Sequence, residues 1–257
     1  GPNVVADGLT IPEGYTLAQI ASTVEQFTGG RISAADFTAA ASDASVYAGE
    51  FPFLADAGSN SLEGYLFPKT YEVADDATAD SLIRLMLQQF QAETASLDWS
   101  YPESIGLSRY DAVKLASIVE KESSGDETIR AQVASVFYNR LTTEGEPTYG
   151  MLQSDATTAY EVGHDPTPED VATPSAYNTY TNTGLTPTPI CAPSIDCLQA
   201  VCAPAETSYF FGIDDWFRRQ TDELSGGRKQ LLALASIIVL APPPIILDEP
   251  TTGLHAA

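Results

Sequence analysis

Two glutamates of one short segment, Glu120 and Glu122, have the residue type best suited to acid chemistry. At about 100° per residue, Glu122 falls on the apolar face of a helix, whereas Glu120 falls about 160° away. The apolar members of that face are Leu115, Ile118 and Val119. A carboxyl group on an apolar face is costly to ionise, because burial favours its neutral form. A general acid needs that neutral form, so Glu122 is the first catalytic candidate.

The helix that positions these glutamates has a clear start. Ser108, with Asp111 three residues later, is typical of a capped N-terminus, and Gly125 predicts the end. Periodicity leaves a second interpretation open, in which Glu122 lies at a frayed helix end and points into water. The next helix is expected over 127–141. Its inward-facing residues are predicted to be Ile129, Val133, Val136 and Phe137.

The first 60 residues predict a small helical module. Thr16 can cap a helix that Gly29 and Gly30 end, and Ser33 precedes a second short helix that carries Phe37. The apolar face of the first helix consists of Leu17, Ile20, Ala21 and Val24. Pro68 makes the aromatic segment 62–71 an irregular strand and turn rather than a helix, and a helix is expected over 79–92.

Residues 142–195 are rich in Thr, Pro, Gly and Asn, which indicates a long, loop-dominated region with short strands. Loops of that length in a compact domain usually have a function or are disordered. Together with the helices, this pattern predicts the α+β class.

The composition excludes some functions. The chain has 257 residues and a formal charge of −23, and all the excess negative charge lies in residues 1–215. Such a surface repels phosphate groups, so we expect no nucleic-acid partner. Residues 1–8 lack the basic start and apolar run of a signal peptide, so either the protein stays in the cytoplasm or its natural beginning is missing.

Cysteines and histidines are too few for a metal site. The three cysteines, Cys191, Cys197 and Cys202, allow one bridge with one free thiol, and the two histidines, His164 and His255, are isolated. A zinc site would need at least one more ligand at suitable spacing, so no metal is expected.

Five strings occur in an order and spacing similar to those of one family. They are LEGYLFPKTY at 62–71, LASIVEKES at 115–123, VASVFYNRL at 133–141, LQSDATTAY at 152–160 and SAYNTYTNTGLTPTPIC at 175–191. Over about residues 9–213 the chain resembles the YceG-like, MltG-type endolytic murein transglycosylases. The family's catalytic glutamate is the second acid of the E-K-E triplet, which corresponds to Glu122.

The resemblance implies cleavage of peptidoglycan glycan strands without water. Glu122 would protonate the oxygen that links N-acetylmuramic acid to N-acetylglucosamine. The resulting carboxylate would then take the proton of the muramic 6-hydroxyl, which closes a 1,6-anhydro ring. One carboxyl group suffices and no cofactor is expected, in contrast to the two carboxyl groups of most glycoside hydrolases.

Other positions of the matching strings are candidate substrate contacts. Gln153, Asp155 and Asn178 can form hydrogen bonds with acetamido and hydroxyl groups, and Tyr177 and Tyr180 offer flat faces to sugar rings. Each could instead be an ordinary turn or core residue. Asp155 has a second possible role as a partner that orients Glu122. Two weaker candidates, expected to be structural supports, are Glu63 and Asn139.

The resemblance also predicts the domain order. Residues 1–60 would be a LysM-like module that holds glycan or acts only as a spacer, and residues 61–214 the catalytic domain. Family members work at the outer face of the bacterial cytoplasmic membrane, held by an N-terminal membrane helix, and we expect that helix to be missing from this sequence. The partners implied are peptidoglycan glycan strands and the peptidoglycan synthesis machinery.

Residues 215–257 resemble a different family. LSGG at 224–227 and IILDEPTTGLH at 245–255 look like the signature and Walker B segments of an ABC-transporter ATPase, in which Asp248 would help hold magnesium and Glu249 would polarise water. The chain contains no G-x-x-x-x-G-K-[ST] loop to bind phosphate. We therefore expect an ABC-like remnant that does not fold independently, behind a chimeric join near residues 214–220.

Three other functions remain open at this level. A noncatalytic glycan-binding protein would leave Glu122 idle, and a hydrolase would use Glu122 together with Asp155. An ATP-binding transporter subunit is the third alternative.

Overall fold

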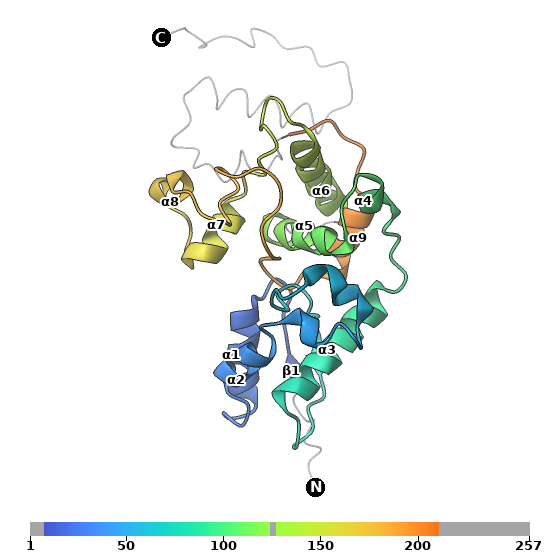
Figure 1. Ribbon diagram of the computed structural model, residues 1–257, viewed down its shortest axis with the longest axis vertical. Coiled ribbons are helices and arrows are strands. Elements are labelled where there is room, and N and C mark those ends of the chain that lie inside the picture. The colour runs from blue at the N-terminus through green and yellow to red at the C-terminus, as the bar shows by residue number, and fades with distance from the viewer. Residues whose placement is uncertain (1–7, 124–126, 211–257) are drawn as a thin grey trace, which may run out of the picture. The chain divides into compact units, whose positions relative to one another are not determined.

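The computed structural model describes residues 8–123 and 127–210, which lie within one compact unit that ends at Phe210 (Figure 1). Helices make up most of the secondary structure in this unit, and they are accompanied by a two-stranded sheet. This mixed architecture agrees with the α+β prediction. The predictions for residues 215–257, Asp248 and Glu249 among them, lie outside the described residues, as does Gly125.

The predicted N-terminal helices are confirmed. The first elements are β1 (Leu9–Thr10), α1 (Leu17–Phe27), α2 (Ala34–Ala40) and the 3₁₀ turns η1 (Ala44–Val46) and η2 (Pro52–Ala57). The Thr16 hydroxyl accepts the N–H of Gln19, and the Gln19 side chain accepts the N–H of Thr16. Ser33 accepts the N–H of Asp36 at the start of α2. Both caps satisfy N–H groups that a helix start leaves without a partner.

The segment 62–71 is the irregular strand and turn that Pro68 predicts. Its last two residues form β2 (Thr70–Tyr71), which pairs antiparallel with β1 and places Leu9 opposite Tyr71. Earlier in the segment, Gly64 has a φ of +85°, and a Cβ there would come within 2.5 Å of Pro189. Only glycine meets both conditions, so Gly64 lets this segment approach the chain near residue 189 closely.

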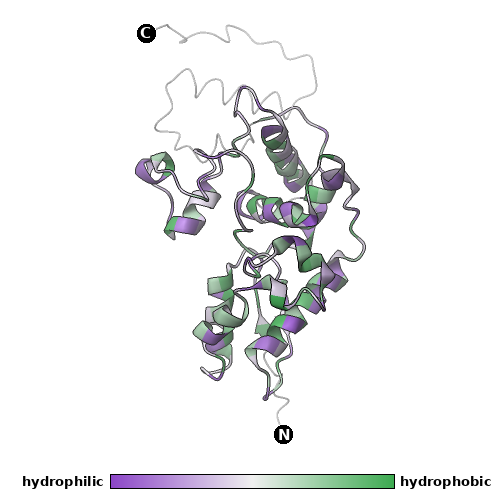
Figure 2. Ribbon diagram, in the orientation of Figure 1, coloured by the Kyte–Doolittle hydropathy of each residue, from purple (hydrophilic) through white to green (hydrophobic). Residues whose placement is uncertain are grey.

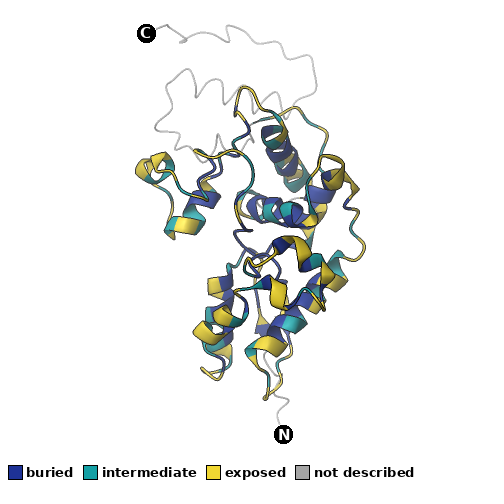
Figure 3. Cartoon of the chain, viewed as in Figure 1, coloured by how far each residue is buried: buried dark blue, intermediate teal, exposed yellow. Residues whose placement is uncertain are grey.

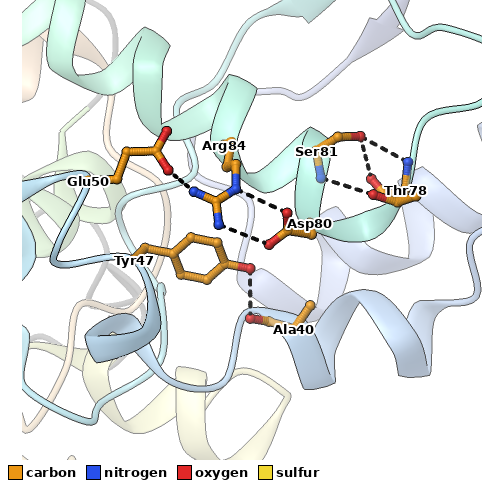
Figure 4. Close-up of polar contacts among 7 residues, drawn as sticks. All are labelled: Ala40, Tyr47, Glu50, Thr78, Asp80, Ser81 and Arg84. Carbon is orange, nitrogen blue, oxygen red and sulfur yellow. Dashed lines mark hydrogen bonds and ion pairs between the residues drawn. The ribbon is translucent and has the colours of Figure 1, made fainter.

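Helix α3 (Ala79–Thr94) exceeds its predicted range by two residues. Arg84 on its surface forms ion pairs with Asp80 and Glu50, and its guanidinium lies 5.2 Å from the Tyr47 ring centre (Figure 4). The same figure shows the Tyr47 hydroxyl donating to the carbonyl oxygen of Ala40, at 3.3 Å. The pair with Glu50 links α3 to the N-terminal module, whereas the pair with Asp80 lies within α3. Each of these half-exposed pairs contributes at most about 1 kcal/mol.

The centre of the unit is built around α5. Helices α4 (Ser100–Ser104), α5 (Arg109–Glu122), α6 (Glu127–Thr142) and α9 (Ile195–Cys202) pack there, and α5 contacts α4, α6 and α9. Ser108 and Asp111 form the predicted cap of α5. Leu115, Ile118 and Val119 are fully buried, and each contributes roughly 1.5–3 kcal/mol by leaving water. Figure 3 shows buried residues along most of this helix, and Figure 2 shows hydrophobic and hydrophilic residues mixed on it.

Two expectations about these helices were wrong. Ile129 on α6 is 37% exposed rather than inward-facing, whereas its neighbour Arg130 forms an ion pair with Asp196 on α9. The sequence pattern also missed α4 and α9.

The three cysteine thiols are free and buried, and two of them, Cys197 and Cys202, lie on α9.

The short strands expected within 142–195 were also wrong. That region contains two short helices, α7 (Asp155–Val162) and α8 (Pro168–Ala172), and a single isolated bridge between Met151 and Gly184. Thr167, Pro168 and Asp170 explain α8, since they supply a capping box and a proline at its first turn. Figure 3 shows α8 without buried residues, in contrast to α5.

Candidate functional site

Glu122 is the last residue of α5, and its side chain contacts the start of α7. Its Oε1 accepts a hydrogen bond from the Ser154 hydroxyl at 2.7 Å and a longer one from the N–H of Ala156 at 3.4 Å. The residue is half-buried. It therefore lies at a helix end, as one interpretation had it, but its carboxyl group is held by protein donors rather than by bulk water. Its immediate neighbours are polar, which the apolar helix face did not predict.

Ser154 is held in place by two threonines. Its N–H donates to the Thr179 hydroxyl oxygen at 3.0 Å, and that oxygen lies 2.9 Å from the hydroxyl oxygen of Thr157. Within the described part of the chain, the Ser154 hydroxyl makes no capping bond to α7, although Ser154 occupies the N-cap position. The hydroxyl is oriented toward Glu122 instead. The Glu122 carboxyl group thus lies where a capping side chain would, near the partial positive charge of the helix start.

The chain that leads to Ser154 follows an unusual path fixed by Arg140. Gln153 has a φ of +51°, in the left-handed region that few residues other than glycine adopt. The guanidinium of Arg140, only 2% exposed, donates to the carbonyl oxygen of Leu152 at 2.5 Å and to that of Phe210 at 2.5 Å. Backbone strain of this kind gathers at functional sites and needs surrounding structure to persist.

Asp155 directly follows Ser154 in the chain, and its side chain contacts Tyr180. The Tyr180 hydroxyl donates to Asp155 Oδ1 at 2.8 Å, and Asp155 is exposed. Ser154, rather than Asp155, is the residue whose side chain donates to Glu122. Gln153 is half-exposed, and its N–H donates to the carbonyl oxygen of Thr179 at 3.0 Å. These three candidates keep exposed surface, and Gln153 and Asp155 flank Ser154, the residue that donates to Glu122.

Tyr177 and Asn178 are engaged within the protein. The Asn178 side chain is fully buried; its Nδ2 donates to the carbonyl oxygens of Val171 and Thr173, and its Oδ1 accepts the N–H of Tyr180. The Tyr177 hydroxyl pairs with the hydroxyl of Thr188 at 2.8 Å, and its ring is half-buried. Their role as sugar contacts stays a prediction, and their geometry favours the alternative, that of turn and core residues.

Glu120 has a different environment from Glu122. Its Oε2 accepts the N–H of Ser194 at 2.8 Å and the Ser194 hydroxyl at 2.6 Å, at the start of α9. The Ser194 hydroxyl also caps α9 by accepting the N–H of Cys197. Glu120 is therefore part of a helix cap, and the choice of Glu122 over Glu120 as the acid stays a prediction.

Glu63, expected only as a support, is an almost fully buried carboxyl group. It is 2% exposed and accepts the N–H of Leu17 and the hydroxyl of Tyr160. Burial raises the pKa of this carboxyl group to about 7, against the opposing effect of its hydrogen bonds. Asn139, the other expected support, donates to the carbonyl oxygens of Thr207 and Tyr209 at 2.9 Å.

Two residues of the site were missed from the sequence, Ser154 and Thr179. The signal for Ser154 was its place directly before Asp155 in the string 152–160, typical of a helix cap. Thr179 gave no signal, since its role depends on a contact across 25 residues of chain. Among residues 8–123 and 127–210, no three His, Cys, Asp or Glu side chains form a group that could hold a metal ion.

Comparisons with known proteins identify the family of this chain. A model of the YceG-like family matches residues 2–230. A relative from Streptococcus pneumoniae strain R6, named endolytic murein transglycosylase, is 36% identical over 228 residues, which are 80% of this chain and 40% of the relative. The chain thus spans about two fifths of that relative's length.

A solved structure and a second kind of relative also match. The crystal structure of a yceG-like protein from Listeria monocytogenes has a TM-score of 0.68 at 30% identity, and the match covers 81% of this chain and 69% of that one. A protein of Caldanaerobacter subterraneus named as an ABC transporter ATP-binding protein is 54% identical over 44 residues, 17% of this chain and 18% of its own. Within the described ranges, no helix is long and apolar enough to cross a membrane.

Proposed function

Because the chain belongs to the YceG-like family, we propose that it is an endolytic peptidoglycan lytic transglycosylase. The reaction would break the bond between N-acetylmuramic acid and N-acetylglucosamine and leave 1,6-anhydro ends. The observation that carries this proposal is the single carboxyl group of Glu122, held by the Ser154 hydroxyl, in a chain similar to a relative named for that activity.

The chemistry follows from one proton carried by Glu122. The neutral acid gives its proton to the bridging oxygen, so that the bond from this oxygen to the muramic anomeric carbon breaks. The carboxylate then removes the proton of the muramic 6-hydroxyl, and that oxygen bonds to the anomeric carbon. The proton moves from the 6-hydroxyl to the leaving sugar by way of Glu122, and no water is consumed.

The surroundings of Glu122 support the second half of this cycle. Ser154 and Ala156 both present hydrogen-bond donors to Oε1. Donors stabilise the carboxylate that exists between the two proton transfers, and they are in place before the reaction begins. Asp155 is paired with Tyr180, so the geometry offers less support for a second carboxyl group acting with Glu122 as in a hydrolase.

The substrate would be a glycan strand that lies along Glu122. We propose Gln153, Asp155 and Tyr180 as its contacts, because they keep exposed surface, Gln153 and Asp155 flank Ser154, and Tyr180 is bonded to Asp155. We propose Tyr177 and Asn178 as supports of that surface. The place of action proposed for the protein is the outer face of the bacterial cytoplasmic membrane, next to the peptidoglycan synthesis machinery. A LysM-like, glycan-holding role for residues 1–60 stays part of the proposal.

The test compares Glu122→Gln with Glu120→Gln on purified glycan strands, with the products identified by mass spectrometry. General acid–base catalysis contributes about 10²- to 10⁴-fold, so Glu122→Gln should lower the rate of anhydro-end formation by that factor while strands still bind. Glu120→Gln should keep most of the rate. Reducing ends heavier by the mass of one water would instead identify a hydrolase. Strand binding without any product from the wild type would identify a noncatalytic binder.

A further inference from the structure

Glu63 is a buried carboxyl group that the proposed reaction does not use. Both of its oxygens lie 3.0 Å from the N–H of Leu17, and Oε2 also accepts the Tyr160 hydroxyl at 3.0 Å. The positive charge of Lys121 lowers the pKa of Glu63 only slightly compared with burial, and the Lys121 ammonium group itself donates to the carbonyl oxygen of Gly14. Burial of a carboxyl group to this extent costs free energy of folding unless hydrogen bonds compensate for the lost water.

The two partners of Glu63 belong to distant parts of the chain. Leu17 is the first residue of α1. The capping box satisfies the N–H groups of Thr16 and Gln19 but not that of Leu17. Tyr160 lies on α7. Glu63 therefore joins the start of an N-terminal helix to the helix whose first residues hold Glu122.

Helix α7 has little apolar anchorage of its own. Its buried residues are Thr157 and Thr158, both polar. The Tyr160 ring is half-buried and packs at 5.1 Å from the ring of Tyr177. With so little hydrophobic contact to fix it, the helix depends on directional bonds, and the Tyr160 hydroxyl bonds α7 to Glu63 in the segment 62–71.

A shift of Tyr160 would move the hydrogen-bond donors that hold the Glu122 carboxyl group. Tyr160 lies five residues after Asp155, about 7.5 Å along the helix. Because an α-helix is stiff over that length, rotation or sliding at Tyr160 displaces the Ser154 hydroxyl and the Ala156 N–H. A displacement of 1 Å at such groups is enough to cost a large factor in rate.

We propose that Glu63 is a positioning residue, which acts through Tyr160 to set where α7 begins relative to Glu122. This inference rests on the proposed function. Glu63 does not touch substrate, since its side chain is enclosed. Because Glu63 also accepts the N–H of Leu17, its carboxyl group couples the position of α1 to the position of α7.

The first test is Tyr160→Phe in the 257-residue chain, which removes the hydroxyl and keeps the ring. We expect kcat for anhydro-end formation to fall about five- to tenfold, as for the loss of one buried hydrogen bond. KM should change little, and the melting temperature should fall no more than in the matched control below. The matched control is Tyr138→Phe, since the Tyr138 hydroxyl is also buried and donates to the carbonyl oxygen of Val201 on α9. That control should leave kcat unchanged.

The second test is a double-mutant cycle with Glu63→Gln. If Glu63 acts through Tyr160, the double variant should lose no more kcat than the stronger single variant. Losses that multiply would overturn the proposal, and so would a Tyr160→Phe protein that melts earlier but keeps the wild-type kcat. A wild type that forms no anhydro ends refutes the proposed function itself, whereas an active wild type with an indifferent Tyr160→Phe variant refutes only the role of Glu63.

Discussion

Glu120 and Glu122 stand two residues apart on one helix, and each accepts bonds from a serine hydroxyl and a main-chain N–H at a helix start. On the Glu120 side, the serine also caps its helix, and that helix, α9, buries Leu198 and Val201 in the core. On the Glu122 side, the serine leaves its helix uncapped, and α7 buries only threonines.

The difference separates a carboxyl group that completes a helix cap, Glu120, from the one that we propose for catalysis, Glu122. The bonds to Glu120 complete a cap on a helix that the core already holds. The bonds to Glu122 are made at the expense of a cap, on a helix that other hydrogen bonds must hold. Donors withheld from the helix and aimed at a carboxyl group are what a catalytic site requires.

The largest expected effect is on stability, with Glu120→Ala. Removal of the acceptor leaves the Ser194 N–H and hydroxyl without their charged partner, so the free energy of unfolding should fall by about 3 kcal/mol. Glu122→Ala should change it by less than about 1 kcal/mol, because the freed Ser154 hydroxyl can then cap α7. Urea denaturation of both variants measures the difference, and equal losses would show that the two sides of α5 are not distinct.

A smaller effect is expected from the serines themselves. Ser154→Ala should lower kcat about tenfold, the equivalent of one hydrogen bond to a charged group, with little loss of stability. Ser194→Ala should do the reverse and cost about 1 kcal/mol as a lost cap. Rates of anhydro-end formation and melting temperatures of the two variants provide the check. A Ser194→Ala protein that is stable but slow would contradict it.

The smallest effect concerns the pH dependence of stability. The pKa of Glu63 is raised from 4.5 to about 7 in the folded chain, so between these values the folded state binds the extra proton. Its contribution to stability is complete below pH 4.5 and is lost as the pH rises through 7. Between pH 6 and pH 8 the wild type should lose about 1 kcal/mol that Glu63→Gln does not lose. Denaturation curves at both pH values test this, and parallel losses in the two proteins would exclude it.

The sequence determined the local elements whose signals are local. Thr16, Ser33 and Ser108 each cap the helix that follows, because a serine or threonine before an apolar helical repeat satisfies N–H groups within a few residues. Periodicity also placed Leu115 and Ile118 in the core. The same reasoning, together with the family resemblance, singled out Glu122.

Only the tertiary structure decided what surrounds Glu122. The apolar helix face predicted apolar neighbours, but the donors come from Ser154 and Ala156, more than 30 residues further along the chain. The prediction of short strands within 142–195 was wrong, because Thr, Pro and Asn occur at helix starts as readily as in turns. Glu63 and Tyr160 meet across 97 residues. Such contacts are fixed by the packing of whole helices. A local sequence pattern therefore does not predict which distant hydroxyl group will bond to a given carboxyl group.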